Sequence, residues 1–402
     1  MPVTLGRVVF SDKEDVEMSL GRKSLIPILF LVVAFAGTWT PVSAQAPPPK
    51  YAYVANWTDN TVSGYLRDAT TGVLTQITGS PWPTDAIGTR GQGPAAVTVD
   101  NKDSCVFVAN FISNTVSAFK ITSSTGVLTP VTGSPFAAGT GPLGIAVDFA
   151  TALVYVANAF SNDVSAYKTS PSTCALTPVT GSPFKDPAGV IAPASVVVDP
   201  SGTFVYVANE FSGNVSGFKI NLTSNFGALT TVGAPIAAGT CPISVVAVPQ
   251  SGVNFIYVSN DCSNNVSGYS YNASGVLALV PGTNPIPAGS SPGLATIPLG
   301  FRQLYVPNFD SSSVSVYSIS TSCTPGPCTG AMTENTGSPF RTGTGPTSVA
   351  VDQSGKFAYV TSMLSNNVYG YNIDGTTGAL TPMAAPSPFA AGQFAISAFF
   401  TP

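Results

Sequence analysis

One four-residue pattern occurs seven times along the chain and limits its fold more than any other feature. The first copy reads Tyr-Val-Ala-Asn, and the others vary it only slightly. The copies occupy residues 53–56, 107–110, 155–158, 206–209, 257–260, 305–308 and 359–362. Neighbouring copies begin 48 to 54 residues apart. A period of this size is typical of solenoids, arrays and propellers.

Each repeat contains four short apolar segments separated by Gly, Pro, Asn and Ser. In the third repeat these segments span residues 144–148, 153–158, 164–168 and 175–179. They are apolar on both faces, so each four-stranded sheet must be covered by a neighbour on either side. Only 8% of the residues are charged, and the 39 Gly and 35 Pro suit many turns rather than helices. Radial stacking of sheets satisfies all of these conditions.

The two ends of the repeat region indicate how the stack closes. The chain enters at Tyr51 directly in a second strand, without a first strand before it. It leaves through residues 394–400, which we align with the first strand at 347–352. We therefore predict an all-β fold: a seven-bladed β-propeller over residues 51–402, with four antiparallel strands per blade. The C-terminal strand is expected to pair into the N-terminal blade and close the ring.

The N-terminal segment has the features of a signal peptide. Arg22 and Lys23 precede an apolar run at 25–37, and a small-x-small pattern lies at 42–44. The apolar run is short for a membrane anchor. We predict a signal peptide over 1–44, with Met18 as an alternative start, and a Pro-rich lead-in over 45–50. The mature protein is then expected outside the cytoplasm: secreted, periplasmic or at the cell surface.

An exported protein can form disulfides, and the six Cys can be paired by their place in the repeats. Cys323 and Cys328 share one short insertion. Cys241 and Cys262 fall on one rim of one blade. Cys105 and Cys174 are left, and would link neighbouring blades on the opposite rim. Zinc is a poorer alternative because the chain has no CxxC spacing and no His.

The repeats resemble a known family. The residues that carry the likeness are Val-Ala-Val-Asp at 349–352, Ser-Gly at 354–355, Tyr-Val-Thr-Ser at 359–362, Ser-Asn-Asn-Val at 365–368 and Gly-Ala-Leu-Thr-Pro at 378–382. They are similar to the YVTN family of β-propeller repeats and, more broadly, to the seven-bladed lactonase-like propellers. The likeness covers about residues 51–402. It implies a lactone hydrolase of the 6-phosphogluconolactonase-like kind.

Several recurring polar residues are expected to serve the fold. Asp100, Asp148, Asp199 and Asp352 end first strands, where a carboxylate can accept hydrogen bonds from the backbone of the following turn. The loops after the second strands carry many amide and hydroxyl oxygens but few carboxylates. Calcium prefers several carboxylates, so we expect no cofactor and no metal, with calcium as the weaker alternative.

A ligand is expected at the axis, on the rim where the crossovers between blades enter. The residues predicted nearest the axis there form a small apolar collar: Ala95, Leu143, Ala194, Ile243, Gly293, Thr347 and Gln393. The chain has no His, so the commonest general base is absent, and no catalytic set can be assembled from the collar. Weak candidates on this rim are Arg90 and Arg341 as clamps, with Glu210 or Asp310 as a base.

These features leave more than one function open. The export signal, the uniform repeats and the missing catalytic set favour a binding or interaction scaffold at the cell envelope or outside the cell. The alternatives are the lactonase implied by the resemblance and a purely structural repeat protein. The formal net charge of −4, without a basic cluster in the repeats, excludes nucleic acid as a partner. We expect a monomer that binds a protein, a glycan or a small molecule, without a transmembrane span after cleavage.

Overall fold

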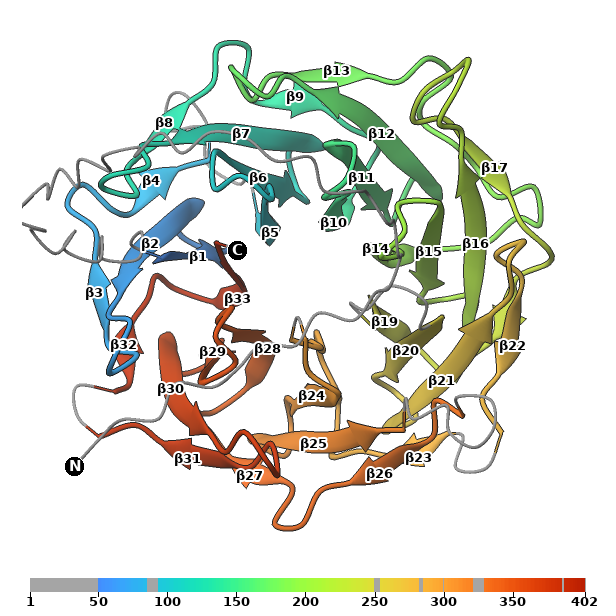
Figure 1. The fold of residues 1–402 in the computed structure, drawn as a ribbon. Coiled ribbons are helices and arrows are strands. Elements are labelled where there is room, and N and C mark those ends of the chain that lie inside the picture. The colour runs from blue at the N-terminus through green and yellow to red at the C-terminus, as the bar shows by residue number, and fades with distance from the viewer. Residues whose placement is uncertain are drawn as a thin grey trace, which may run out of the picture. The chain divides into compact units, whose positions relative to one another are not determined.

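The repeats fold into seven sheets arranged around one axis (Figure 1). The computed structural model describes residues 50–84, 93–248, 254–281, 285–298, 300–320, 329–384 and 387–401. These lie in a compact unit that spans Pro48–Pro402. The described residues contain strands and turns but no helix, and hence no helix that could cross a membrane. The predicted signal peptide and most of the predicted lead-in, residues 1–49, lie outside the described residues.

Each sheet, or blade, runs from an inner strand at the axis to a short outer strand. The inner strands are β5 (Pro94–Val99), β10 (Pro142–Val147), β14 (Pro193–Val198), β19 (Pro242–Ala247), β28 (Pro346–Val351) and β33 (Ala395–Phe400). The second strands are β1 (Lys50–Asn56), β6 (Cys105–Asn110), β11 (Leu153–Asn158), β15 (Phe204–Asn209), β20 (Phe255–Asn260), β24 (Gln303–Asn308) and β29 (Phe357–Ser362). They hold the recurring tetrapeptide, and their side chains are almost entirely buried between blades.

The outer half of each blade is a hairpin with a short edge. The third strands are β2 (Thr61–Arg67), β7 (Thr115–Ile121), β12 (Asp163–Thr169), β16 (Asn214–Ile220), β21 (Asn265–Tyr271), β25 (Ser313–Ile319) and β30 (Asn367–Ile373). The outer strands are β3 (Leu74–Gln76), β8 (Leu128–Pro130), β13 (Leu176–Pro178), β17 (Leu229–Thr231), β22 (Leu277–Leu279), β26 (Met332–Glu334) and β31 (Leu380–Pro382). Pro at three of these outer strands blunts the exposed edge.

The crossovers between blades add short pieces to the third strands. Two-residue strands in six crossovers are β4 (Trp82–Pro83), β9 (Phe136–Ala137), β18 (Ile236–Ala237), β23 (Ile286–Pro287), β27 (Phe340–Arg341) and β32 (Phe389–Ala390). In the crossover after β13, a single bridge between Val164 and Phe184 takes the same place. We number the blades 1 to 7 by their second strands, so blade 1 holds β1 and blade 7 holds β29.

The predicted closure of the ring is confirmed. The C-terminal strand β33 pairs antiparallel with β1, with Val54 opposite Ala398 (Figure 1). Phe400 packs against Tyr359 of blade 7, with ring centroids 4.5 Å apart. Blade 1 therefore takes its inner strand from the end of the chain and its other strands from the beginning.

The register of this last strand differs from the sequence alignment by three residues. The predicted collar places Gln393 level with Thr347, but the pairing with β1 makes Ser397 the counterpart of Ser348, and hence Ile396 the counterpart of Thr347. Phe394 instead has a φ of 55° and occupies the left-handed position that precedes the Pro of other inner strands. Blade 1 has Ala395 where those blades have Pro, so the usual marker of the strand's start is missing.

Blade 6 also departs from the predicted regular plan. Its innermost segment, residues 292–298, forms only isolated bridges to β24 and to Ser348 of blade 7. Pro307 in β24 has no N–H to donate at the centre of this pairing, which explains the interrupted ladder. Gly293 lies so close to blade 7 that an added Cβ would fall 2.7 Å from the Thr347 carbonyl oxygen.

The recurring Asp residues serve the turns, as expected from the sequence. Asp199 accepts hydrogen bonds from the N–H groups of Thr203 and Phe204, and Asp352 accepts them from Lys356 and Phe357. Asp100 and Asp148 accept backbone hydrogen bonds in the equivalent turns. These carboxylates therefore hold the turn between the first and second strands rather than a metal ion.

A tyrosine hydroxyl joins most blades to the next one. In six of the seven interfaces, the Tyr of the recurring tetrapeptide donates a hydrogen bond to a glycine carbonyl in the turn between the third and outer strands of the following blade. These pairs are Tyr53–Gly126, Tyr155–Gly227, Tyr206–Gly275, Tyr257–Gly330, Tyr305–Gly378 and Tyr359–Gly72. Burial raises the pKa of all six hydroxyls, so they remain donors. We call this contact the Tyr–Gly latch.

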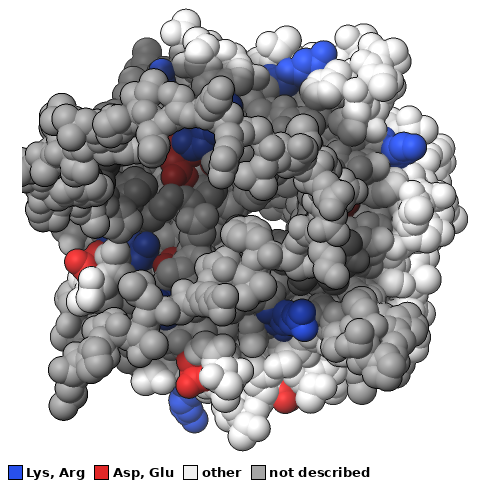
Figure 2. All heavy atoms as spheres, viewed as in Figure 1, with Lys and Arg blue, Asp and Glu red and all other residues white. Residues whose placement is uncertain are grey.

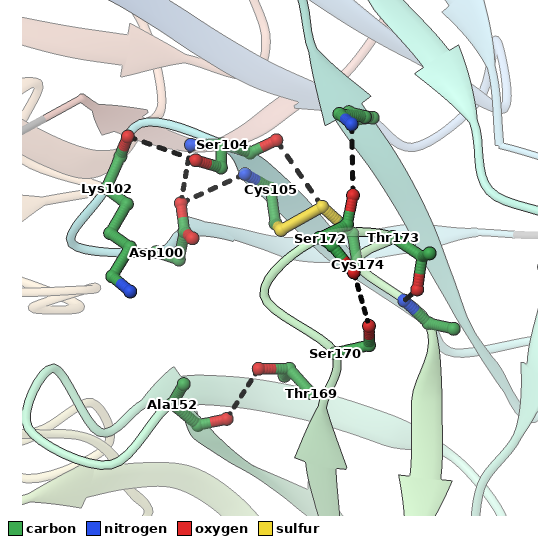
Figure 3. The surroundings of a disulfide bond; sticks show 12 residues. Asp100, Lys102, Ser104, Cys105, Ala152, Thr169, Ser170, Ser172, Thr173 and Cys174 are labelled. Atoms are coloured by element: carbon green, nitrogen blue, oxygen red, sulfur yellow. Dashed lines mark hydrogen bonds between the residues drawn. A yellow bond between two sulfur atoms is a disulfide. The ribbon is translucent and has the colours of Figure 1, made fainter.

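The remaining interface, between blades 2 and 3, is closed by a disulfide instead. Phe107 replaces the Tyr, and Cys174 replaces the Gly with a left-handed φ of 60°. Cys174 is bonded to Cys105, at the start of β6, with a Cα–Cα distance of 5.6 Å (Figure 3). A second disulfide joins Cys241 and Cys262 within blade 5. The expectation that the chain forms disulfides is thus confirmed, while Cys323 and Cys328 lie outside the described residues.

Candidate functional site

The seven residues predicted to form an apolar collar lie where the inner strands begin, but they do not form one uniform ring. Ala95, Ala194 and Gly293 are buried, Leu143, Ile243 and Thr347 are half-buried, and Gln393 is exposed. In the observed register, Ile396 rather than Gln393 is the residue of blade 1 that corresponds to Thr347. Thr347 is committed to the fold, because its hydroxyl lies 3.0 Å from the Thr361 hydroxyl and 3.2 Å from the Ala395 carbonyl. The collar therefore offers little chemistry.

The candidate acid–base groups on this rim are carboxylates from three successive blades. Glu210 and Asp261 directly follow the Asn that ends the second strands of blades 4 and 5, and Asp310 lies in the same loop of blade 6. Backbone hydrogen bonds to the residue before each inner strand fix the first two: Glu210 N–H to Ala192 and Asp261 N–H to Cys241. We call Glu210, Asp261 and Asp310 the rim carboxylates.

Ser291 connects two of the rim carboxylates. Its N–H donates to Asn264 in the loop of blade 5, at 2.8 Å, which holds it beside Asp261. Its hydroxyl donates to Asp310 Oδ2 at 2.7 Å, although the two residues are 19 positions apart in the chain. Ser291 has a left-handed φ of 55°, at a position where three other blades have Gly. A hydroxyl held between two carboxylates from different blades is suited to position a polar ligand or a water molecule.

Burial and the charge of a neighbouring carboxylate raise the pKa of two of the rim carboxylates, Glu210 and Asp261. Burial raises the pKa of Glu210, and the negative charge of Asp261 raises it further. Burial likewise raises the pKa of Asp261, the hydrogen bond from Ser291 opposes this, and the charge of Asp310 adds to the rise. A carboxylate with a raised pKa is a better proton acceptor when it is ionised, so these shifts mark a candidate for general-base chemistry.

Of the two arginines predicted to bind a ligand, Arg90 and Arg341, the structure describes only Arg341. Arg341 is exposed in β27, which pairs with the start of β25 and so brings Arg341 to the same end of blade 6 as Asp310. No ion pair of Arg341 occurs within the described ranges, and Arg90 lies outside them. On the face shown in Figure 2, Lys and Arg side chains of the described residues lie apart from one another rather than in one patch.

The other half of the rim is aromatic, a feature that sequence reasoning missed. The Trp57 and Phe111 ring centroids are 5.4 Å apart, and those of Phe111 and Phe160 are 5.0 Å apart. Trp57 and Phe111 occupy the position directly after the recurring Asn, as Glu210 and Asp261 do in blades 4 and 5. The signal was available in the sequence, because this position varies far more around the ring than the tetrapeptide before it: its residues are Trp57, Phe111, Ala159, Glu210, Asp261, Phe309 and Met363.

Among the described residues, no three His, Cys, Asp or Glu side chains lie close enough together to hold one metal ion, so the rim carboxylates do not form a cage of metal ligands. What the arrangement can do chemically is accept a proton from water and position a hydroxylated ligand. The recurring Asp residues are excluded from this role because turn N–H groups occupy them.

Comparison with solved structures confirms the fold. A candidate 6-phosphogluconolactonase from Bacteroides uniformis is 14% identical, with a TM-score of 0.71 over 88% of this chain and 100% of its own. A second candidate from Bacteroides fragilis is 16% identical, with a TM-score of 0.71 over 89% and 99% of the two chains. The periplasmic gluconolactonase of Pseudomonas aeruginosa is 17% identical, with a TM-score of 0.69 over 88% and 99%.

The family is shown at the level of sequence. No curated protein matches the chain. The family model described as "Lactonase, 7-bladed beta-propeller" matches residues 43–192 and 246–393, which is most of the repeat region. This confirms the resemblance that the recurring tetrapeptides indicated. The chain belongs to the seven-bladed β-propeller lactonase family.

Proposed function

We propose that this protein is a lactone hydrolase that acts on a sugar or related lactone. Membership of the lactonase family carries the proposal. It reverses the order of the sequence analysis, in which a binding or interaction scaffold came first and lactone hydrolysis was the alternative. The two described disulfides support a place outside the cytoplasm, where such bonds persist.

The rim carboxylates supply the chemistry that lactone opening needs. Glu210, when ionised, accepts a proton from a water molecule as the water oxygen attacks the ring carbonyl carbon, and the charge of Asp261 beside it raises its pKa. The tetrahedral intermediate then breaks its bond to the ring oxygen, which takes the proton back from the same carboxyl group. The product is the open hydroxy acid, and the carboxylate is regenerated. No His is required, because a partly buried carboxylate with a raised pKa takes its role.

The neighbouring groups suit a polyhydroxylated ring. Ser291 and Asp310 offer a fixed hydroxyl and carboxylate for sugar hydroxyl groups, and the exposed Arg341 at the same end of blade 6 offers a donor for a carbonyl or an anionic group. The aromatic half of the rim, formed by Trp57, Phe111 and Phe160, offers faces on which a sugar ring can stack.

The test is hydrolysis of a panel of aldonolactones and simple γ- and δ-lactones by the mature protein, followed by base uptake at constant pH. We expect saturable turnover, and a loss of roughly 100-fold or more in kcat for Glu210→Gln combined with Asp261→Asn, the usual contribution of a general base. The matched control is Asp59→Asn, in the equivalent loop of blade 1, where the carboxylate accepts a hydrogen bond from the Gln393 N–H.

Two results would contradict the proposal at different points. A rate no higher than spontaneous hydrolysis for every lactone would refute lactone hydrolysis itself. Turnover that survives in the double variant as well as in the control would leave the activity in place but refute the assignment of Glu210 and Asp261.

A further inference from the structure

A cavity of about 670 Å³ lies on the axis of the ring, and the proposed hydrolysis makes no use of it. Inner-strand residues of all seven blades line it. Its lining extends to the turns that follow the inner strands, through Phe149, Pro200 and Gln353, at the opposite end of the blades from the rim carboxylates. None of the seven predicted collar residues lines it. Its size is that of a typical small-molecule site.

The cavity walls are mainly apolar. Val, Ile, Ala, Leu and Phe side chains of the inner strands dominate the lining, with hydroxyl groups of Thr98, Thr296 and Ser348 among them. The inner strands are also the last strands of their sheets, so each presents one backbone edge to the axis. Within the described residues, the bridge between Leu294 and Ser348 joins two of these edges. The edge N–H groups of Val97, Val245 and Ala295 also bond to neighbouring blades. The remaining edge groups offer backbone donors and acceptors to a ligand between apolar surfaces.

Serine hydroxyls hydrogen-bond neighbouring inner strands to one another around the cavity. The Ser397 hydroxyl accepts a hydrogen bond from the Val97 N–H of blade 2 at 3.4 Å, and Ser195 and Ser244 accept equivalent bonds from the following blades at 3.1 Å. Each of these links crosses from one inner strand to the next. The cavity wall is therefore held by bonds between blades, and a ligand would meet a preformed site.

The charged side chains that line the cavity are all acidic. Asp148, Asp199 and Asp352 stand at the end away from the crossover rim, fixed by their turns. Arg67 lies 3.6 Å from Asp352 but is not part of the lining, and no Lys or Arg among the described residues lines the cavity. Arg67 offsets the charge of Asp352, which leaves Asp148 and Asp199 as the source of negative potential. An anionic ligand would meet this potential, whereas an uncharged ligand would meet no such penalty.

An exposed aromatic side chain marks the mouth. Phe149 follows Asp148 in the turn of blade 3 and is 49% exposed, and its carbonyl accepts a hydrogen bond from the Asn101 side chain. Both residues line the cavity. Other blades have Asn101, Pro200 or Gln353 at this position, so the turn itself does not require an aromatic residue. A ligand that covered the exposed part of this ring would gain apolar burial.

We propose that the axial cavity binds an uncharged small molecule with an apolar body and one or two hydrogen-bonding groups. The apolar walls hold the body, Phe149 covers its exposed end, and the hydroxyls and strand edges satisfy its polar groups. The acidic mouth rejects anions. This site is separate from the rim carboxylates and does not depend on hydrolysis there.

The experiment compares octan-1-ol with octanoate, which share a chain length and differ in charge, by calorimetric titration at pH 7 and low salt. We expect saturable binding of octan-1-ol and at least roughly ten-fold weaker binding of octanoate, with the difference shrinking as added salt screens the carboxylates. Phe149→Ser should weaken octan-1-ol binding several-fold. The matched control is Phe211→Ser, which removes an exposed Phe from the crossover rim and should leave binding unchanged.

Filling the cavity gives a second readout. Thr296→Trp places a large side chain at a half-buried lining position and should abolish octan-1-ol binding. If that variant unfolds at a lower temperature than the parent, the binding of octan-1-ol by the surface variant Phe149→Ser still tests the proposal. The proposal is overturned if octan-1-ol shows no saturable binding, if octanoate binds as tightly, or if Phe149→Ser binds like the parent protein.

Discussion

Rebuilding the Tyr–Gly latch where a disulfide now stands tests how the ring is held together. At the interface of blades 2 and 3 the latch is absent, because Phe107 has no hydroxyl and Cys174 is bonded to Cys105. The double variant Cys105→Leu/Cys174→Gly removes the disulfide and restores the residues found at the interface of blades 3 and 4. Adding Phe107→Tyr then supplies the missing donor.

The magnitudes follow from the structure. The disulfide spans 69 residues, and its loss should cost about 4 kcal/mol in the free energy of unfolding by the loop-entropy relation. Glycine at position 174 relieves a left-handed φ of 60°, which recovers about 1 kcal/mol. We therefore expect the double variant to be about 3 kcal/mol less stable than the parent. Phe107→Tyr should restore about 1 kcal/mol through one buried hydrogen bond.

The assay is equilibrium denaturation in urea under oxidising conditions, followed by tryptophan fluorescence and by circular dichroism. The matched control is Tyr206→Phe, which removes the same hydrogen bond, to Gly275, from the interface of blades 4 and 5. Its loss should be similar in size to the gain from Phe107→Tyr. If the triple variant is no more stable than the double variant while Tyr206→Phe is destabilising, the two interfaces are not equivalent and the latch reasoning is refuted.

Three further predictions concern the ring. Deleting residues 394–402 should lower the free energy of unfolding by more than about 3 kcal/mol, because blade 1 loses its buried inner strand and Phe400 with it. A melting temperature unchanged by the deletion would show that this strand does not close the ring. Gly144→Ala should lower the free energy of unfolding by about 2 kcal/mol, because the added Cβ would lie 2.8 Å from the backbone of the next inner strand. Gly375→Ala is the control: its Cβ would point into open space, so the same urea titration should show no change. Arg67→Met should cost about 3 kcal/mol by leaving buried Asp352 without its cation, and equal melting of variant and parent would contradict this.

The fold could be predicted from the sequence because the tetrapeptide recurs at a nearly constant interval and both ends stop at complementary points of the repeat. The register of β33 could not be predicted, because Ala395 replaces the Pro that marks the start of other inner strands. Phe394 also has a positive φ, which nothing about a Phe residue indicates in the sequence. The Cys105–Cys174 link between blades could be predicted, but not that it replaces a Tyr–Gly latch, because only the structure shows that Phe107 and Cys174 occupy the positions of the latch pair.

The candidate site was predictable only in part. Glu210 and Asp310 could be named because charged residues are rare on this rim, but their coupling through Asp261 and Ser291 depends on contacts between blades. The axial cavity could not be predicted, because its width depends on how closely the seven inner strands approach one another. Gly144 and Gly293 permit two of those approaches, and their effect appears only when the neighbouring strand is in place.

The dependence of lactone hydrolysis on pH tests the central claim most directly. Only the ionised carboxylate can accept a proton, so kcat/KM should rise with pH through a midpoint above 4.5, the ordinary pKa of Glu, because burial and Asp261 raise the pKa of Glu210. Asp261→Asn removes the neighbouring charge and should move this midpoint to lower pH. No hydrolysis above the spontaneous rate at any pH, or a midpoint that Asp261→Asn leaves in place, would contradict the account.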